Sequence, residues 1–246
     1  NLPMSTRSAL IVIPTTGADS LADAVASATS QTHGNTEVLV IIDGPEYHDR
    51  AHAIIRRFPG VKRMTLPWNT GKNGWYGHRI YFLSAPLVDQ DYWLALDQDN
   101  WFEPNHIETL VKTIQAGNEW AYSLRKIVDQ EGQYICNDDC ESLGKWKSVL
   151  NDNFIDVNCY MIPKIAALSF SPYWYRRARH PQEQPEVDRI LSAFMMQNFK
   201  TFDTNGQYSV NYRVASRSDS VQDSFFIRGN EVMKQNMNGE YPWRKI

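Results

Sequence analysis

Residues 92–99 read Tyr-Trp-Leu-Ala-Leu-Asp-Gln-Asp, an apolar run of five residues that ends in two acidic residues with one spacer. The apolar run predicts a buried strand, because it is short, continuous and closed by polar residues. Two similar runs precede it along the chain, at residues 9–13 and 37–42, and residues 61–66 predict one more strand between them and it. Continuous apolar strands of this kind are typical of a sheet that is covered on both faces.

Helical patterns separate these four strands. Apolar residues recur at helical spacing, and capping or Pro signals mark several of the starts, in residues 20–31, 46–58, 75–87 and 104–116. Strands that alternate with helices indicate βαβ units, which build a parallel sheet with helices on both faces. The first half of the chain therefore predicts a Rossmann-like α/β fold with a mostly parallel sheet.

The second half is less regular. It predicts a hairpin from residues 120–128 and 133–136, further strands at 154–162 and 208–214, a loop at 173–184, and helices at 186–199 and 218–234. These signals indicate a smaller mixed sheet. Since no linker or repeat divides the chain, we expect one domain over residues 1–246, with halves at about 8–117 and 118–246.

Composition excludes several classes of protein. The 246 residues are 42% hydrophobic and 22% charged, which is ordinary for a globular chain. The formal net charge of −3 argues against a nucleic-acid partner, which usually meets a basic surface. Three cysteines cannot form a disulfide scaffold, and we find no secretory signal and no apolar stretch of about 18 residues. We expect no transmembrane segment and a cytoplasmic location.

Polar side chains follow three of the predicted strands. Thr15, Asp43 and Asp97 each come at or just after a strand end, and ligands of parallel α/β sheets bind at that carboxyl edge. Asp97 and Asp99 supply oxygen ligands suited to Mg²⁺ or Mn²⁺, which often bridge to substrate phosphates. The plainer alternatives are an acidic turn at Asp97-Gln98-Asp99 and turn formation at Asp43-Gly44.

Two further segments carry candidate residues. Residues 69–79 combine glycines with Lys72, His78 and Arg79, so backbone N–H groups and cations there can meet a phosphate. Asp188 lies at a predicted helix start, where it either serves as a general base or simply complements the helix dipole. Glu186 and Asp156 are the alternative candidates for the base.

The order of these motifs resembles the inverting nucleotide-sugar glycosyltransferases of family 2, which have the GT-A fold. The resemblance rests on Pro14-Thr15, on Asp43, on residues 69–79 and 96–104, and on Asn211-Tyr212-Arg213-Val214, and it spans roughly residues 8–230. It implies that the first half binds the nucleotide sugar and that the second half binds the acceptor.

The same resemblance implies a role for each candidate residue. Thr15 and Asp43 would contact the nucleoside, and Arg79 with His78 would flank the base or the diphosphate. Asp97 would lie by the ribose and the metal, Asp99 would bind the metal, and Asp188 would be the catalytic base.

The sequence therefore predicts a metal-dependent inverting glycosyltransferase that uses Mn²⁺ or Mg²⁺. The donor would be a nucleotide sugar, with a UDP-sugar favoured, and the acceptor a hydroxyl of a glycan or similar molecule. Two alternatives stay open. One is a carbohydrate- or nucleotide-binding module on the same fold, and the other is a metal-dependent phosphohydrolase or nucleotidyltransferase.

Overall fold

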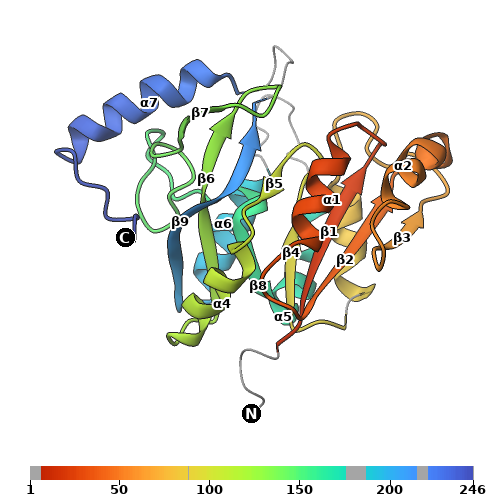
Figure 1. The fold of residues 1–246 in the computed structure, drawn as a ribbon. Helices are drawn as coiled ribbons and strands as arrows, with labels where there is room; N and C mark the ends of the chain where they lie inside the picture. The colour runs from red at the N-terminus through yellow and green to blue at the C-terminus, as the bar shows by residue number, and fades with distance from the viewer. Residues whose placement is uncertain (1–6, 88, 176–186, 215–220, 246) are drawn as a thin grey trace.

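A computed structural model describes residues 7–87, 89–175, 187–214 and 221–245 (Figure 1). Its centre is a nine-stranded sheet with the order β3-β2-β1-β4-β8-β6-β9-β5, and β7 pairs with β6 off this path. The strands are β1 (Ala9–Thr15), β2 (Thr36–Ile42), β3 (Lys62–Thr65), β4 (Tyr92–Ala95), β5 (Trp101–Phe102), β6 (Trp120–Val128), β7 (Tyr134–Asn137), β8 (Tyr160–Pro163) and β9 (Phe202–Arg213).

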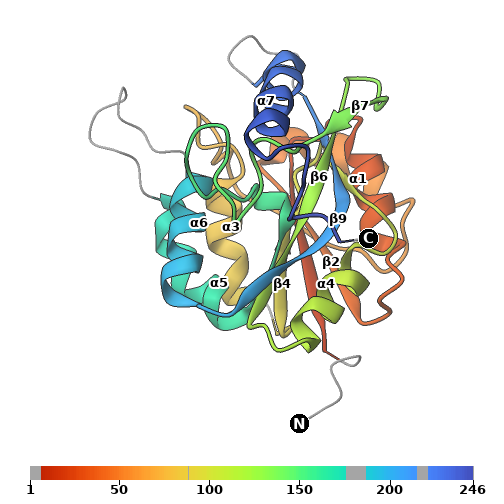
Figure 2. The same ribbon diagram turned by 90° about the vertical axis from the view of Figure 1, so that its left-hand side faces the viewer.

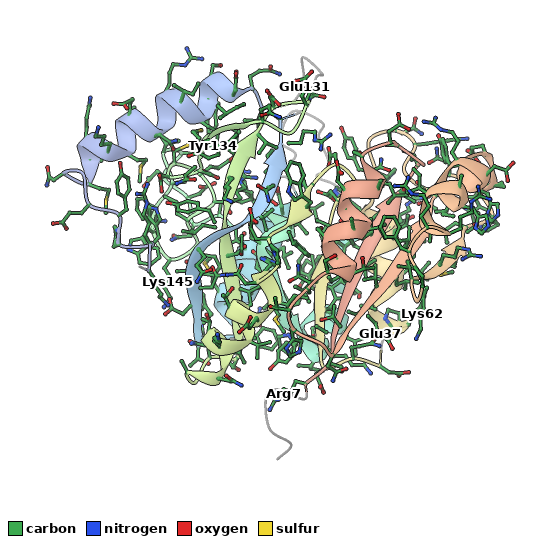
Figure 3. All side chains as sticks on the ribbon, viewed as in Figure 1. Arg7, Glu37, Lys62, Glu131, Tyr134 and Lys145 are labelled. Atoms are coloured by element: carbon green, nitrogen blue, oxygen red, sulfur yellow. The ribbon has the colours of Figure 1, made fainter. Side chains whose placement is uncertain are left out.

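The first half forms the parallel arrangement that the sequence predicts. β1 pairs in parallel with β2 on one side and β4 on the other, and β2 pairs in parallel with β3. All seven residues of β1 are buried, which explains its unbroken apolar sequence. The edge strand β3 carries exposed charge, and its Lys62 forms an ion pair of 3.0 Å with Glu37 of β2 (Figure 3).

The sheet as a whole is mixed, because the parallel strands of the first half continue into the smaller mixed part that the sequence predicts. Among the described strands, four pairings are parallel and four are antiparallel. β8 pairs antiparallel with both β4 and β6 and so joins the two halves into one sheet. Asn158, two residues before β8, is hydrogen-bonded to Asp97 just beyond the carboxyl end of β4, so β8 begins where β4 ends and the two strands run in opposite directions.

Helices cover both faces of the sheet. Figure 2 shows α3, α5 and α6 on one face and α1 and α4 on the other, while α7 lies beside β7 at the far end. The helices are α1 (Leu21–Thr29), α2 (His48–Ile55), α3 (His78–Ser84), α4 (His106–Gln115), α5 (Lys164–Phe170), α6 (Val187–Asn198) and α7 (Asp223–Asn236). Within the described ranges, no helix is both long and apolar enough to cross a membrane.

Several boundaries differ from the sequence prediction. The strand predicted at 154–162 is instead a short 3-10 helix, η4 (Val157–Cys159), followed by β8, because the Asp156 side chain accepts from the backbone N–H of Asn158 and turns the chain. Part of the predicted loop at 173–184 lies in a second 3-10 helix, η5 (Ser171–Tyr175), and the rest lies outside the described residues. β5 and α5 have no counterpart in the prediction.

Aromatic side chains fill much of the core, which accounts for part of their high content in the sequence. Trp93, Trp120 and Trp243 are among the largest fully buried side chains. Trp120 stacks on Phe202 with ring centroids 4.3 Å apart, across the parallel pairing of β6 with β9.

Candidate active site at the carboxyl edge of the sheet

The structure brings the ends of β1 and β4 together through one glutamine. The Thr15 hydroxyl donates to Gln98 Oε1 over 2.7 Å, and the backbone N–H of Thr16 donates to the same oxygen over 3.1 Å. Thr15 Oγ1 also accepts from the backbone N–H of Gly17 at 2.9 Å. Thr15 is buried, so in this structure its hydroxyl fixes the strand ends that border the site.

Asp43 organises the loop that follows β3. Its Oδ1 accepts from both the backbone N–H and the hydroxyl of Thr70, at 2.8 and 2.7 Å, and its Oδ2 accepts from the backbone N–H of Gly71 at 2.9 Å. A Cβ at Gly71 would lie 2.6 Å from the Tyr76 carbonyl oxygen and 2.9 Å from Asp43 Oδ2. The close packing explains why this loop position is glycine.

Arg79 is held by aromatic rings. Its guanidinium carbon lies 4.6 Å from the ring centroid of Trp75 and 5.2 Å from that of Tyr175, and those two rings stack 5.3 Å apart. Its Nε is buried and has no hydrogen-bond partner within the described part of the chain. His78, at the start of α3, lies 5.6 Å from the ring of Trp174. A cation is thus fixed beside the loop that Asp43 shapes.

Asp97 is half-buried, and both of its carboxylate oxygens accept hydrogen bonds. Oδ1 accepts from the Tyr81 hydroxyl at 2.6 Å, and Oδ2 accepts from the Asn158 amide at 3.0 Å. Burial, followed by the neighbouring charge of Asp99, raises the pKa of Asp97 to about 6. Burial, followed by the neighbouring carboxylate of Asp97, raises the pKa of Tyr81 well above its ordinary value.

Asp97 and Asp99 fit a divalent cation that is shared with a substrate. Both side chains are half-buried, so they combine partial exposure with close negative charge. The described residues contain no group of three or more His, Cys, Asp or Glu side chains arranged to hold a metal. Mg²⁺ is commonly held by one or two carboxylates together with substrate phosphates, and the pair meets that requirement.

Asp156 lies next to this pair but is fully engaged. Its Oδ1 accepts from the backbone and side-chain N–H groups of Asn158, at 2.9 and 2.8 Å, and its Oδ2 accepts from Arg125 at 2.8 Å. It is buried. These contacts give Asp156 a part in the frame around Asp97.

Asp188 lies in the first turn of α6 and is half-buried. Its Oδ1 accepts from the backbone N–H of Arg189 at 2.9 Å, and the Arg189 guanidinium pairs with Glu141 and Asp152 at 3.1 and 2.9 Å. The other sequence candidate on this segment, Glu186, lies outside the described residues.

Three contributors to the site were missed by the sequence prediction: Gln98, Tyr81 and Asn158. Asn158 carried a usable signal, because it is a polar residue inside a run that otherwise reads as a buried strand. Tyr81 gave none, since a tyrosine on a helix is ordinary.

A family model described as glycosyl transferase family 2 matches residues 10–177. Among solved structures, S. aureus TarS 1–349 in complex with UDP has a TM-score of 0.62 and 13% identity, covering 93% of this chain and 66% of that one. TarS 1–349 in complex with UDP-GlcNAc has a TM-score of 0.62 and 12% identity, and the match covers 94% of this chain and 66% of that one. A further S. aureus TarS structure has a TM-score of 0.59 and 11% identity, and the match covers 97% of this chain and 44% of that one.

The chain therefore spans about two thirds or less of the length of these structures. At such identities the likeness establishes the fold. A search among curated proteins gives no match.

Proposed function

The chain belongs to glycosyl transferase family 2, a family of glycosyltransferases, and on that premise we propose that it transfers a sugar from a UDP-sugar to a hydroxyl of a glycan or similar acceptor. The predicted resemblance and the predicted GT-A fold are confirmed. The observation that carries the proposal is that Asp43 and Asp97 follow the carboxyl ends of β2 and β4, the two strands that flank β1 in one parallel arrangement.

UDP is the favoured nucleotide because the solved structures with a similar fold include one in complex with UDP and one in complex with UDP-GlcNAc. The nucleoside would lie over the ends of β1 and β2, near Thr15 and Asp43. Arg79, with His78, would face the base or the diphosphate. The buried Nε of Arg79 has no hydrogen-bond partner among the residues that the structure describes, which supports a role in donating to an anionic ligand.

Asp97 and Asp99 would hold Mn²⁺ or Mg²⁺ against the diphosphate of the donor. When bound, the ion would neutralise negative charge on the leaving nucleoside diphosphate. The chain's own contribution is to keep the two carboxylates in place and to add the positive charge of Arg79.

Asp188 would act as the general base. It would take the proton of the acceptor hydroxyl while the acceptor oxygen attacks the anomeric carbon. The new bond forms on the face of the anomeric carbon opposite the diphosphate. The nucleoside diphosphate leaves with the electron pair of its bond to that carbon. The configuration is therefore inverted. Asp188 is favoured over Asp156, because Asp156 is buried in an ion pair with Arg125 whereas Asp188 is half-buried in the first turn of α6.

A cytoplasmic location is part of the proposal and is supported by three cysteines that form no disulfide: Cys136, Cys140 and Cys159. The nucleotide-binding half would be about residues 8–117 and the acceptor-binding half about 118–246.

A product screen tests the proposal. The chain is incubated with UDP-, GDP- and dTDP-sugars and Mn²⁺, with and without glycan acceptors, and the products are analysed by mass spectrometry. Release of UDP together with free or transferred sugar is the expected result. Release of inorganic phosphate or pyrophosphate would instead indicate a phosphohydrolase or nucleotidyltransferase. Intact donor under all conditions would indicate a binding module.

A further inference from the structure

Asn158 occupies an unusual position between the two halves of the sheet. It lies in η4, is fully buried, and its side-chain amide contacts Asp97 twice. The amide oxygen accepts from the backbone N–H of Asp97 at 2.7 Å, and the amide nitrogen donates to Asp97 Oδ2 at 3.0 Å. The Asn158 side chain, from the second half of the chain, is thus hydrogen-bonded to both the backbone and the carboxylate of Asp97, which follows β4.

The orientation of this amide has only one solution. Its second N–H donates to Asp156 Oδ1 at 2.8 Å, so both amide hydrogens and the oxygen have partners. A flipped amide would point an N–H at the backbone N–H of Asp97 and its oxygen at two carboxylates. Asp156 is itself fixed by Arg125 at 2.8 Å. The amide therefore cannot rotate without breaking three hydrogen bonds.

Tyr81 completes the arrangement from the other side. Its ring is buried and packs edge-on against Trp93, with centroids 5.7 Å apart, and its hydroxyl donates to Asp97 Oδ1 at 2.6 Å. Each carboxylate oxygen of Asp97 consequently accepts one hydrogen bond from a rigidly held donor and can still accept from, or ligate, another partner. The plane of the carboxylate is set before any ligand arrives.

We propose that Asn158 and Tyr81 are positioning residues that fix the Asp97 carboxylate for the divalent cation of the nucleotide-sugar site. The inference rests on the proposed function, since it assumes that Asp97 and Asp99 hold that cation. Groups that orient the ligands of a metal are typically worth ten- to hundredfold in metal affinity, because the cation otherwise has to order its own ligand.

The test separates the cation from the nucleotide. UDP is titrated calorimetrically into the native chain with Mn²⁺ and with a chelator, and the ratio of the two dissociation constants is the metal gain. Asn158→Ala and Tyr81→Phe are expected to lower the metal gain about tenfold. The metal-free dissociation constant for UDP should stay within about twofold of native, because neither side chain hydrogen-bonds to Asp43 or to the two residues that Asp43 holds, Thr70 and Gly71.

The matched control is Asn205→Ala. Asn205 is also a buried amide, but it bonds to Thr109 and to Ser209, on elements away from Asp97. Its metal gain should equal the native value. Tyr81→Phe retains the ring and its packing, so it keeps the test decisive even where Asn158→Ala fails to fold.

Two results would overturn the inference while leaving the proposed function standing. One is an unchanged metal gain in the two variants beside a clear gain in the native chain. The other is a parallel loss of metal-free and metal-dependent binding, which would show that the side chains only hold the fold. A native chain without any metal gain would instead overturn the proposed metal site, and the inference with it.

Discussion

Gly71 shows at the scale of one residue how the site depends on close packing. Its backbone N–H donates to Asp43, and an added Cβ would lie 2.6 Å from a backbone oxygen, closer than such contacts occur. We predict that Gly71→Ala weakens UDP binding about tenfold, since overpacking costs about 1–3 kcal/mol and displaces the loop. Calorimetry with UDP measures the effect.

Gly34→Ala is the matched control, because a Cβ there meets nothing within 4 Å. It should bind UDP as the native chain does. Equal affinities for UDP in the two variants would contradict the role given to the loop that follows β3.

His106 provides a prediction about pH. The imidazole is fully buried, stacks on Phe102 at 4.0 Å and contacts the Ser209 hydroxyl at 2.7 Å. Burial lowers its pKa to about 3, so the folded chain leaves it neutral at pH values where the unfolded chain protonates it. Its contribution to stability is therefore present above about pH 6.5 and is lost as the pH falls toward 3.

Acidification from pH 7 to pH 5 should lower the free energy of unfolding by about 2 kcal/mol through His106 alone. Urea unfolding of the native chain and of His106→Gln at both pH values measures it. The variant, which cannot titrate at this position, should lose less stability on acidification by about that amount. Parallel losses in the two proteins would count against a buried neutral histidine.

Individual candidate residues were predictable where the argument needed only strand ends. Thr15, Asp43 and Asp97 do lie at the carboxyl edge, as the alternation of strands and helices implied. Their partners were not predictable. Thr15 bonds to a residue 83 positions away, and Asp97 to one 61 positions away. Such pairs are created by tertiary packing, and no local pattern encodes them.

At the scale of one element, α6 carries the candidate base. Asp188 lies in its first turn, and the neighbouring Arg189 is anchored by Glu141 and Asp152, which fixes the start of the helix. We predict that Asp188→Asn lowers sugar transfer at least about 100-fold, the usual contribution of a general base, and leaves UDP affinity unchanged. Initial rates and UDP calorimetry separate the two effects.

Asp223→Asn controls for the helix dipole. Asp223 occupies the first turn of α7 and, like Asp188, accepts from the N–H of the next residue. Transfer should be unaffected in this variant. Near-native turnover by Asp188→Asn would move the base to Glu186 or Asp156.

Elements with strong periodicity were predicted well, and elements created by context were not. β6 spans Trp120–Val128, as its nine-residue pattern indicates, and its hairpin with β7 is confirmed. β5 has only two residues and exists because Trp101 and Phe102 pair with β9, so no pattern of its own announces it. The position of β8 depends on the cap at Asp156, which a run of apolar residues does not reveal.

At the scale of the whole molecule, a buried charge cluster lies between Asp97 and the start of α6. The Arg125 guanidinium pairs with three carboxylates, Asp138, Glu141 and Asp156, at 2.7–2.8 Å. From Arg125 the contacts continue to Asp97 in one direction and to the start of α6 in the other. In order, the connected residues are Asp97, Asn158, Asp156, Arg125, Glu141 and Arg189. The cluster can therefore set the position of the candidate base relative to the candidate metal ligands.

We predict that Arg125→Met destabilises the chain by about 3–5 kcal/mol, because it leaves the buried carboxylates of Asp138 and Asp156 without their cation, while Glu141 keeps Arg189. Urea unfolding measures this cost, and Arg63→Met on the exposed edge of β3 is the control, with an expected change of about 0.5 kcal/mol or less. If Arg125→Met lowers the free energy of unfolding no more than Arg63→Met does, the cluster does not stabilise the fold.

The sheet also shows what the whole sequence could not specify. The parallel order of β1 to β4 follows from βαβ logic. The insertion of β8 between β4 and β6, which makes the sheet continuous and mixed, depends on contacts such as Asn158 with Asp97. The site inherits this geometry, because its two halves share one sheet.

Calorimetric titration of the native chain with UDP, in the presence of Mn²⁺ and in the presence of a chelator, tests the central claim most directly. The account predicts that UDP binds, that Mn²⁺ strengthens the binding, and that GDP and dTDP bind more weakly. Failure of UDP, GDP and dTDP to bind, or binding that Mn²⁺ leaves unchanged, would contradict a metal-dependent nucleotide-sugar site at Asp97 and Asp99.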